Sequence, residues 1–228
     1  MIEFLQKCCL RIGKFQRFDS VKLVGMNERG MLFLLSGPSG VGKGTVRKAL
    51  FRKNPHELLY SISATTRSPR RNEVNGRDYF FVSKAEFEKM INDGKMLEYA
   101  QYVDQYYGTP NTWIEQQRQQ GNDVFMEIEV NGAMQVRSKV PDAILIFLLP
   151  PDLMQLRNRL ELRGTESDEV INQRLKTARQ EILMMTNYDY AVVNDKVDKA
   201  VKKVQTIIEA ERLKAKRLAN SYIRILEG

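Results

Sequence analysis

The chain has 228 residues, of which 43% are hydrophobic and 28% are charged. This composition is near the globular average, so it excludes disordered, collagen-like and disulfide-stapled proteins. The length favours one compact domain with appended subdomains over two independent domains. The longest apolar run, residues 143–149, is far shorter than the roughly 20 residues of a membrane-spanning helix, and no secretory signal precedes it. We therefore predict a cytoplasmic protein that does not contact membranes.

The formal net charge of +8 is concentrated at the two ends of the chain. Residues 1–25 carry a net charge of +3 and residues 199–228 carry +5, whereas residues 26–198 are balanced. Nucleic-acid binding without sequence preference needs a basic face, which the balanced region does not offer. We therefore predict no nucleic-acid partner.

The cysteines and the histidine offer little chemistry. Cys8 and Cys9 are adjacent, so they provide neither a disulfide framework nor the spaced pairs of a zinc site. His56 follows an Asn-Pro pair at an expected helix end, where a surface or capping role is favoured. The chemistry of this protein is therefore expected to need no histidine base.

Strand and helix patterns alternate from residue 31 onward, whereas residues 1–28 lack periodicity and are expected to be an extension, with Met26 as an alternative start. The expected strands are residues 31–35, 60–64, 124–130, 143–149 and 191–193. The expected helices are residues 46–53, 83–94, 110–121, 153–163, 169–185 and 196–218. Continuous apolar strands that alternate with helices predict an α/β fold with a parallel sheet.

Two helix starts carry specific signals, and one stretch interrupts the alternation. Ser83 and Glu86 form a capping-box pattern, and Pro110 would occupy the first position of its helix. Between residues 65 and 107 the sequence is polar, arginine-rich and aromatic, with one helix between extended segments. This stretch is expected to be an inserted subdomain.

A glycine-rich segment follows the first strand and opens the first helix, in the context of a phosphate-binding loop. It comprises Gly37, Pro38, Ser39, Gly40, Val41, Gly42, Lys43, Gly44 and Thr45. Gly37 and Gly42 permit positive φ and a close approach of the backbone, while Lys43 supplies a positive charge to the β and γ phosphates. Because Gly44 stands where the general pattern has Ser or Thr, either Thr45 meets Mg²⁺ or the metal keeps more water.

Several polar side chains outside this loop are candidates for substrate binding. Arg67 and Arg70 flank Pro69 in a short turn suited to gripping one phosphate, although a surface turn with solvated arginines is the alternative. Glu98 lies in an apolar extended segment and needs a partner if it is buried. Arg159 and Arg163 are one helical turn apart and Arg174 lies on the next expected helix, so the three could converge on one side of a hairpin. Spacing alone favours an ordinary salt-bridged surface there.

The motifs around these residues resemble the guanylate kinase family. The resemblance spans about residues 30–210 and rests on residues 61–81, 98–101, 106–109, 163–166, 172–175 and 192–195, in this order. It implies a P-loop NTPase-like parallel sheet flanked by helices, with an inserted mixed α/β GMP-binding subdomain and a helical lid. The implied segments are a core of residues 30–64, 110–150 and 190–210, a GMP-binding subdomain of residues 65–109, a lid of residues 151–189 and a basic C-terminal tail of residues 211–228.

The resemblance implies ATP-dependent phosphorylation of GMP to GDP, with Mg²⁺ accompanying ATP. The implied GMP-binding residues are Ser63, Arg67, Arg70, Tyr79, Glu98, Tyr107, Thr109 and Glu129. The implied ATP-binding residues are Gly37, Pro38, Ser39, Gly40, Val41, Gly42, Lys43, Gly44, Thr45, Arg163 and Asn194. The implied catalytic residues are Lys43, Arg67, Arg163 and Arg174. The implied metal-binding residues, acting directly or through water, are Thr45 and Glu127.

One departure and two rival functions complete the sequence-based hypothesis. The chain has Glu127 and Glu129 where the family is associated with two aspartates, so the division of their roles between base, ribose and hydrated Mg²⁺ stays open. A related interaction module that binds phosphopeptides is one rival, and the intact loop with Lys43 speaks against it. A P-loop GTPase is the other, but the chain has no Asn-Lys-x-Asp guanine motif.

Overall fold

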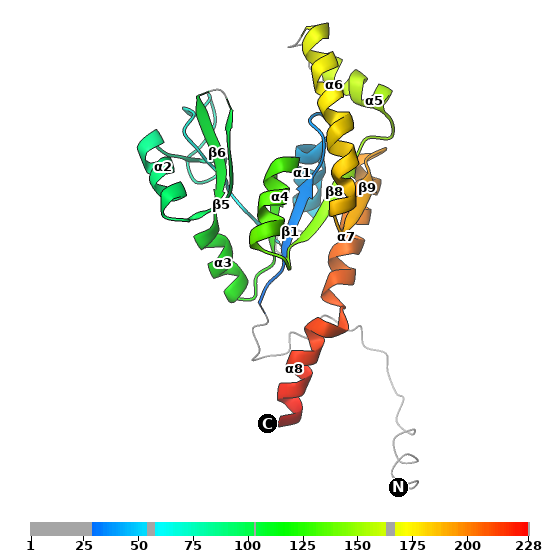
Figure 1. Ribbon diagram of the computed structural model, residues 1–228. Helices are drawn as coiled ribbons and strands as arrows, with labels where there is room; N and C mark the ends of the chain where they lie inside the picture. Colours follow the sequence, from blue (N-terminus) through cyan, green and yellow to red (C-terminus); the bar gives the residue numbers. More distant parts are fainter. Residues whose placement is uncertain (1–28, 54–57, 103, 163–166, 228) are drawn as a thin grey trace.

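The computed structural model describes residues 29–53, 58–102, 104–162 and 167–227, and the fold is built on two sheets (Figure 1). The first sheet has five strands in the order β2-β7-β1-β8-β9, and all its strand pairs are parallel. The bounds of its strands are β1 Leu32–Ser36, β2 Leu59–Tyr60, β7 Val124–Glu127, β8 Ile144–Leu149 and β9 Tyr190–Val193. This sheet confirms the predicted α/β fold.

The second sheet is smaller and mixed, with the strand order β4-β3-β6-β5. Its strands are β3 Ala64–Thr65, β4 Phe80–Phe81, β5 Met96–Tyr102 and β6 Gln105–Pro110. Helix α2 (Lys84–Asn92) packs on it, with Phe87 stacked on Tyr106 at 5.2 Å between ring centroids. The capping box predicted at Ser83 is confirmed at the start of α2. In Figure 1 this sheet and α2 stand to the left of the five-stranded sheet.

The remaining helices surround the five-stranded sheet or project beyond it. Their bounds are α1 Lys43–Lys53, α3 Asn111–Gln119, α4 Val130–Lys139, α5 Leu153–Glu161, α6 Asp168–Leu183, the 3₁₀ helix η1 Met184–Asn187, α7 Val197–Arg212 and α8 Ala215–Glu227. Helices α5 and α6 form a hairpin with an apolar cluster of its own, beyond one end of the sheet (Figure 1). In the part of the chain that the structure describes, no helix has both the length and the apolar composition needed to cross a membrane.

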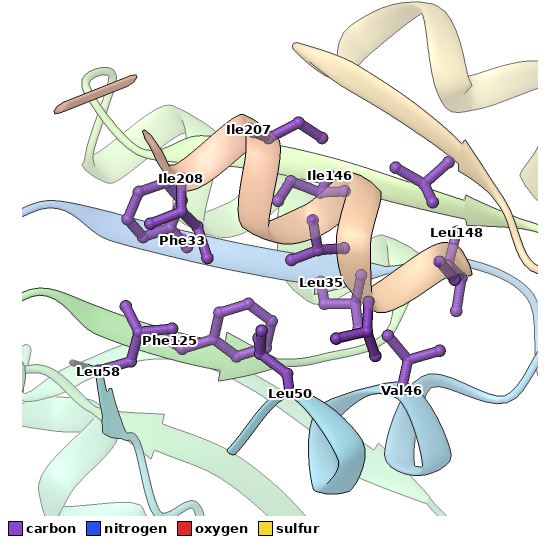
Figure 2. Close-up of a cluster of buried hydrophobic side chains, with 14 of the residues drawn as sticks. Phe33, Leu35, Val46, Leu50, Leu58, Phe125, Ile146, Leu148, Ile207 and Ile208 are labelled. Atoms are coloured by element: carbon purple, nitrogen blue, oxygen red, sulfur yellow. The ribbon is translucent and has the colours of Figure 1, made fainter. Parts of the chain in front are cut away.

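The core lies on both faces of the five-stranded sheet because successive side chains of a strand point to opposite faces. Phe33 and Leu35 belong to the cluster that the sheet forms with α1 and α7 (Figure 2). Leu32 and Leu34 belong to a second cluster, which includes residues of α3 and α4. This packing on both faces explains why β1 and β8 are almost continuously apolar.

Four boundaries differ from the sequence-based expectations. The strand expected over residues 60–64 is two strands, β2 and β3, in different sheets. The strand expected over residues 124–130 ends at Glu127, and Val130, expected as its last residue, instead begins α4, a helix that was not predicted. Pro110 closes β6 and caps α3 from outside, because its extended backbone (ψ 136°) is not helical. The long closing helix breaks between α7 and α8. The expectations for Cys8, Cys9, Met26 and His56 lie outside the described residues.

Candidate active site

The loop between β1 and α1 turns at glycines with positive φ. Gly37 has φ 144°, and a β-carbon at this position would lie 2.3 Å from the carbonyl oxygen of Leu148 on the neighbouring strand. Gly42 has φ 98°, and a β-carbon there would lie 2.7 Å from the side-chain nitrogen Nδ2 of Asn194. Neither position has room for a side chain, so the loop backbone can run close to β8 and to the end of β9.

Lys43, the first residue of α1, is buried with its ammonium group over this loop. Its Nζ donates to the carbonyl oxygen of Gly37 at 2.7 Å and forms an ion pair with Oε2 of Glu129 at 3.1 Å. Glu129 is the N-cap residue of α4 and is largely exposed. The loop therefore combines backbone N–H groups at a helix N-terminus with one fixed cation, which is the chemistry of a phosphate site.

Asn194 and Arg159 hold the loop from the other side. The buried Asn194 donates through Nδ2 to the carbonyl oxygen of Val41 at 2.9 Å. Arg159 on α5 donates to the same oxygen at 3.1 Å and to the carbonyl oxygen of Asn194 at 2.8 Å. Spacing alone had favoured a surface salt bridge for Arg159, but its guanidinium instead links α5 to the loop. The α5–α6 hairpin is thus attached directly to the phosphate-binding segment.

The turn after β3 is organised around Glu73. Both oxygens of Glu73 accept hydrogen bonds from the guanidinium of Arg67, each at 3.0 Å, and one of them also accepts from the backbone N–H of Arg70 at 2.7 Å. The hydrogen bond to Glu73 raises the pKa of Arg67, and the hydrogen bond from Arg67 lowers the pKa of Glu73. A fork-shaped pair of this kind fixes the plane of the guanidinium as well as its position.

Two tyrosines lie beside this arginine. The guanidinium carbon of Arg67 is 5.6 Å from the ring centroid of Tyr79, and Tyr79 meets Tyr107 edge-on with 6.4 Å between centroids. Burial raises the pKa of the Tyr79 hydroxyl above its ordinary value of 10.0. Tyr79 therefore stays protonated at neutral pH and can donate a hydrogen bond to an anion.

A buried carboxylate lies deeper in the small sheet. Glu98 on β5 pairs with Thr109 on β6, whose hydroxyl donates to Oε1 of Glu98 at 2.6 Å. The Thr109 hydroxyl is also 3.2 Å from that of Ser63, so the three side chains form one polar chain. Burial raises the pKa of Glu98, and the hydrogen bond from Thr109 opposes this effect. Gly132 on α4 leaves room for the carboxylate, since a β-carbon there would lie 2.9 Å from Oε2 of Glu98.

A cleft of about 550 Å³ connects the region around Lys43 with the polar side chains of the second sheet. Its predicted lining residues come from the loop and α1, from the second sheet and from the end of β7, and they are Lys43, Ser63, Tyr79, Glu98, Tyr107, Glu127 and Glu129. A larger cavity of about 770 Å³, between α3 and the end of α4, is lined by none of the predicted site residues. The smaller cleft is therefore the candidate active site, since it alone of these two contains the phosphate-site lysine and the buried carboxylate.

A family model described as guanylate kinase matches residues 29–211 of the chain. The chain belongs to the guanylate kinase family. It is a nucleoside monophosphate kinase, a transferase that binds nucleotides. The guanylate kinase of Listeria innocua is 57% identical over 203 residues, which are 89% of this chain and 99% of the relative. The guanylate kinase of Bacillus subtilis is 56% identical over 202 residues, with the same two coverages.

A solved structure agrees with this assignment. The crystal structure of guanylate kinase from Anaplasma phagocytophilum is similar to the chain with a TM-score of 0.67 and 29% sequence identity. The likeness covers 83% of this chain and 90% of that protein. The guanylate kinase fold thus extends over both sheets and not only over the phosphate-binding loop.

Some predicted site residues lie away from the cleft of this guanylate kinase. Arg70 is exposed in the turn after β3, Thr45 is exposed on α1, and neither lines the cleft. Arg174 lies on α6, in the hairpin that projects beyond the sheet. Arg163 lies outside the described residues. This conformation therefore brings together Lys43 of the loop, Glu98 and the two tyrosines, and Arg174 does not line the cleft with them.

Two arginines that sequence reasoning missed line the cleft, namely Arg47 and Arg77. Nε of Arg47 donates to Oε2 of Glu127 at 2.9 Å, and its guanidinium carbon lies 4.4 Å from the ring centroid of Tyr60. Arg47 is four residues after Lys43, so the helical period alone could have placed it on the same face of α1. Arg77 carried no such signal, because it lies in an irregular turn.

The residues of the cleft fit a magnesium ion bound together with phosphates. Glu127 and Glu129 present carboxylates at the end of β7, beside the loop that carries Lys43. The described residues contain no cluster of three or more metal-binding side chains. This arrangement suits Mg²⁺, which commonly takes one or two protein carboxylates and completes its octahedron with substrate phosphates and water.

Proposed function

We propose that this guanylate kinase transfers the γ-phosphoryl group of ATP to GMP, giving ADP and GDP, with Mg²⁺ bound to the ATP phosphates. The observation that carries the proposal is the single cleft of about 550 Å³, which has Lys43 on one wall and Glu98 on the other. A phosphate site and a base-reading carboxylate that share one cleft are the requirement for transfer between two nucleotides.

The GMP side of the proposal rests on donor and acceptor patterns. Guanine presents N1–H and N2–H₂ side by side, and the carboxylate of Glu98 can accept from both. Adenine presents a bare nitrogen there and is repelled. Ser63 and Thr109 contact the same base edge, while Glu129 completes the pocket. The GMP phosphate is proposed to bind to Arg67, Arg70, Tyr79 and Tyr107.

The ATP side of the proposal rests on the loop. Residues 37–45 wrap the phosphates with backbone N–H groups, and Lys43 neutralises charge at the β and γ phosphates. Arg163 and Arg174 approach the triphosphate from the lid, and Asn194 lies beside the adenine. The hydrogen bond that Asn194 donates to the carbonyl oxygen of Val41 supports this proposal, because it holds Asn194 next to the loop.

The proposed chemistry needs no base, because the acceptor oxygen of GMP belongs to a phosphate that is already ionised at neutral pH. The chain aligns the two phosphates, excludes water and neutralises the developing charge with Lys43, Arg67, Arg163 and Arg174. Mg²⁺, when bound, supplies further charge neutralisation at the β and γ phosphates. Glu127 and Thr45 are the proposed residues that hold it, directly or through water.

We propose that separate segments of the chain have separate roles. Residues 30–64, 110–150 and 190–210 form the core, residues 65–109 bind GMP, and residues 151–189 form the lid. We propose a cytoplasmic location, because the adjacent cysteines Cys8 and Cys9 offer no disulfide framework for an oxidising compartment.

A coupled assay of ADP release tests the proposal. With ATP and Mg²⁺ we expect turnover with GMP and little turnover with AMP, CMP or UMP. Absence of turnover with GMP in protein with a normal circular dichroism spectrum and melting transition would contradict the proposal. That result would favour the alternative, a related module that binds phosphopeptides. Binding of phosphopeptides by the same protein would then support this alternative.

A further inference from the structure

Strand β5, which carries Glu98, is an edge strand of the small sheet. The outer side of an edge strand has backbone N–H and C=O groups that no neighbouring strand pairs. In this structure a side chain of α4 pairs two of them. Oε1 of Gln135 accepts from the backbone N–H of Tyr99 at 3.1 Å, and Nε2 of Gln135 donates to the carbonyl oxygen of Tyr99 at 2.9 Å. The amide of Gln135 thus replaces the peptide group of a partner strand at the residue that follows Glu98.

The residue before Glu98 is anchored in the main core. The pairing of β5 with β6 shifts register between Met96 and Glu98, so Leu97 has no register partner, as in a β-bulge. Leu97 is only 4% exposed and belongs to the apolar cluster that includes Ala133 and Val136 of α4. Because a bulge changes the direction of nearby side chains, the packing of Leu97 against α4 helps to set where Glu98 points.

Lys139 holds the same irregular segment of β5. Its Nζ donates to the carbonyl oxygen of Met96 at 2.9 Å, two residues before Glu98. Gly132, Gln135 and Lys139 are spaced by three and four residues, so they lie on one face of α4. Gly132 on this face leaves room for the Glu98 carboxylate. One face of α4 therefore contacts β5 at three points around Glu98.

Lys139 also acts on the charge of Glu98. Burial raises the pKa of Glu98, whereas the hydrogen bond from Thr109 and the positive charge of Lys139 lower it. The negative charge of Glu129, at the start of α4, raises this pKa further. Only the ionised carboxylate is free to accept from both N1–H and N2–H₂ of guanine. Lys139 therefore favours the form of Glu98 that can recognise guanine.

We propose that Gln135 and Lys139 are positioning residues for guanine recognition. Gln135 fixes the β5 backbone beside Glu98, and Lys139 fixes the irregular segment before it and keeps a positive charge near the carboxylate. Neither side chain lines the cleft, so both act through Glu98 and not by touching GMP. The inference rests on the proposed function, because it requires that Glu98 reads the guanine of GMP.

Replacement of Gln135 by methionine tests the backbone contact. Gln135→Met keeps the approximate size of the side chain and removes both hydrogen bonds to Tyr99. The KM for GMP should rise about 3- to 30-fold, while kcat and the KM for ATP stay within about 2-fold of the parent. Gln119→Met removes an exposed side-chain amide from α3 and is the matched control, which should change none of these quantities. A parental KM for GMP in Gln135→Met would overturn the role of Gln135.

Replacement of Lys139 tests the charge, with kcat/KM for GMP measured against pH. This quantity should fall at acidic pH as Glu98 is protonated, and in Lys139→Met the midpoint of the fall should move to higher pH. Lys139→Arg should restore the parental midpoint. Because Lys139 is exposed, the shift should shrink at high salt. Lys95→Met, which removes a surface lysine paired with Asp93 next to Met96, is the matched control.

The comparison between variants isolates Glu98, because the phosphate of GMP titrates alike with every variant. A parental midpoint in Lys139→Met, or the same shift in Lys95→Met, would overturn the role of Lys139. Circular dichroism melting of each variant separates these effects from a failure to fold. Parental protein without turnover toward GMP would reject the proposed function itself, whereas parental turnover with unaltered variants would reject only the roles of Gln135 and Lys139.

Discussion

Replacing Glu98 by glutamine changes one atom of the base-reading group and leaves its shape. The glutamine oxygen can still accept the hydrogen bond that Thr109 donates at 2.6 Å. The other oxygen becomes an NH₂ group, which donates where guanine also donates. Glu98→Gln therefore loses the negative charge of the carboxylate, and its NH₂ group faces a donor group of guanine instead of accepting from it.

The magnitude follows from these two effects. A hydrogen bond to a charged group contributes about 1.5–3 kcal/mol, and an unpaired buried donor costs about 1–3 kcal/mol. Since about 1.4 kcal/mol corresponds to a factor of ten, kcat/KM for GMP should fall on the order of 10²- to 10⁴-fold. The preference for GMP over AMP should narrow, because adenine N1 can accept from the new NH₂ group.

The same substitution should stabilise the protein without ligand. Burial raises the pKa of Glu98 above its ordinary value of 4.5, so the folded chain holds this proton to a higher pH than the unfolded chain does. Stability therefore falls as the pH rises from 4.5 through the folded-state pKa, because the charged carboxylate is costly to bury. Glu98→Gln should have the higher Tm at pH 7.5, and the difference should shrink toward pH 4.5.

The assays are kcat/KM for GMP and AMP, and Tm without nucleotide across this pH range. Glu88→Gln, an exposed glutamate on α2, removes the same charge from the same subdomain and should change neither quantity. If the ratio of kcat/KM for GMP to kcat/KM for AMP is unchanged in Glu98→Gln, the reasoning is refuted, and Glu129 becomes the next candidate for reading the base. A lower Tm at pH 7.5 would refute the electrostatic part.

Three further predictions follow from the cleft. Lys43→Ala should lower kcat on the order of 10²-fold or more while the fold survives, because one cation that faces the phosphoryl oxygens is lost. Steady-state kinetics together with a melting curve check this prediction, and a near-normal kcat would reject the role of Lys43. Gly132→Ala places a β-carbon 2.9 Å from Oε2 of Glu98, so the KM for GMP should rise. The affinity for ATP, measured by calorimetry, should stay unchanged. An unchanged KM for GMP would show that the Glu98 carboxylate can move at no cost. Binding a bisubstrate analogue should reduce the radius of gyration in small-angle scattering, because Arg174 on α6 and the turn that carries Arg67 and Arg70 must approach the same ligand from separate elements. Identical dimensions with and without the analogue would count against closure of the lid.

The parts of the site that could be predicted from the sequence are those encoded locally. The loop at residues 37–45 was predictable because its glycines, its lysine and the flanking apolar strand are contiguous. The capping box at Ser83 is local for the same reason. The family resemblance then assigned roles to Glu98, Ser63 and Thr109, which no local pattern could have joined.

The parts that could not be predicted depend on pairing and on competition between elements. The contact between Glu98 and Thr109 exists because β5 and β6 are neighbours with these residues in register. Helix α4 was missed because Val130 continues the apolar run of β7, and Gly132 weakens the helical pattern. Arg47 was missed because a charged residue on a helix usually faces solvent, whereas Glu127 and Tyr60 hold this one in the cleft.

The central claim is that one cleft aligns ATP and GMP for direct phosphoryl transfer. The most direct measurement uses ATP carrying ³²P in its γ-phosphoryl group, with GMP, Mg²⁺ and purified protein, followed by separation of the nucleotides. We predict that the label appears in the β-phosphate of GDP in a one-to-one ratio with the ADP formed, and that Lys43→Ala slows its appearance. Label released as inorganic phosphate, or retained in ATP by folded protein, would contradict the account.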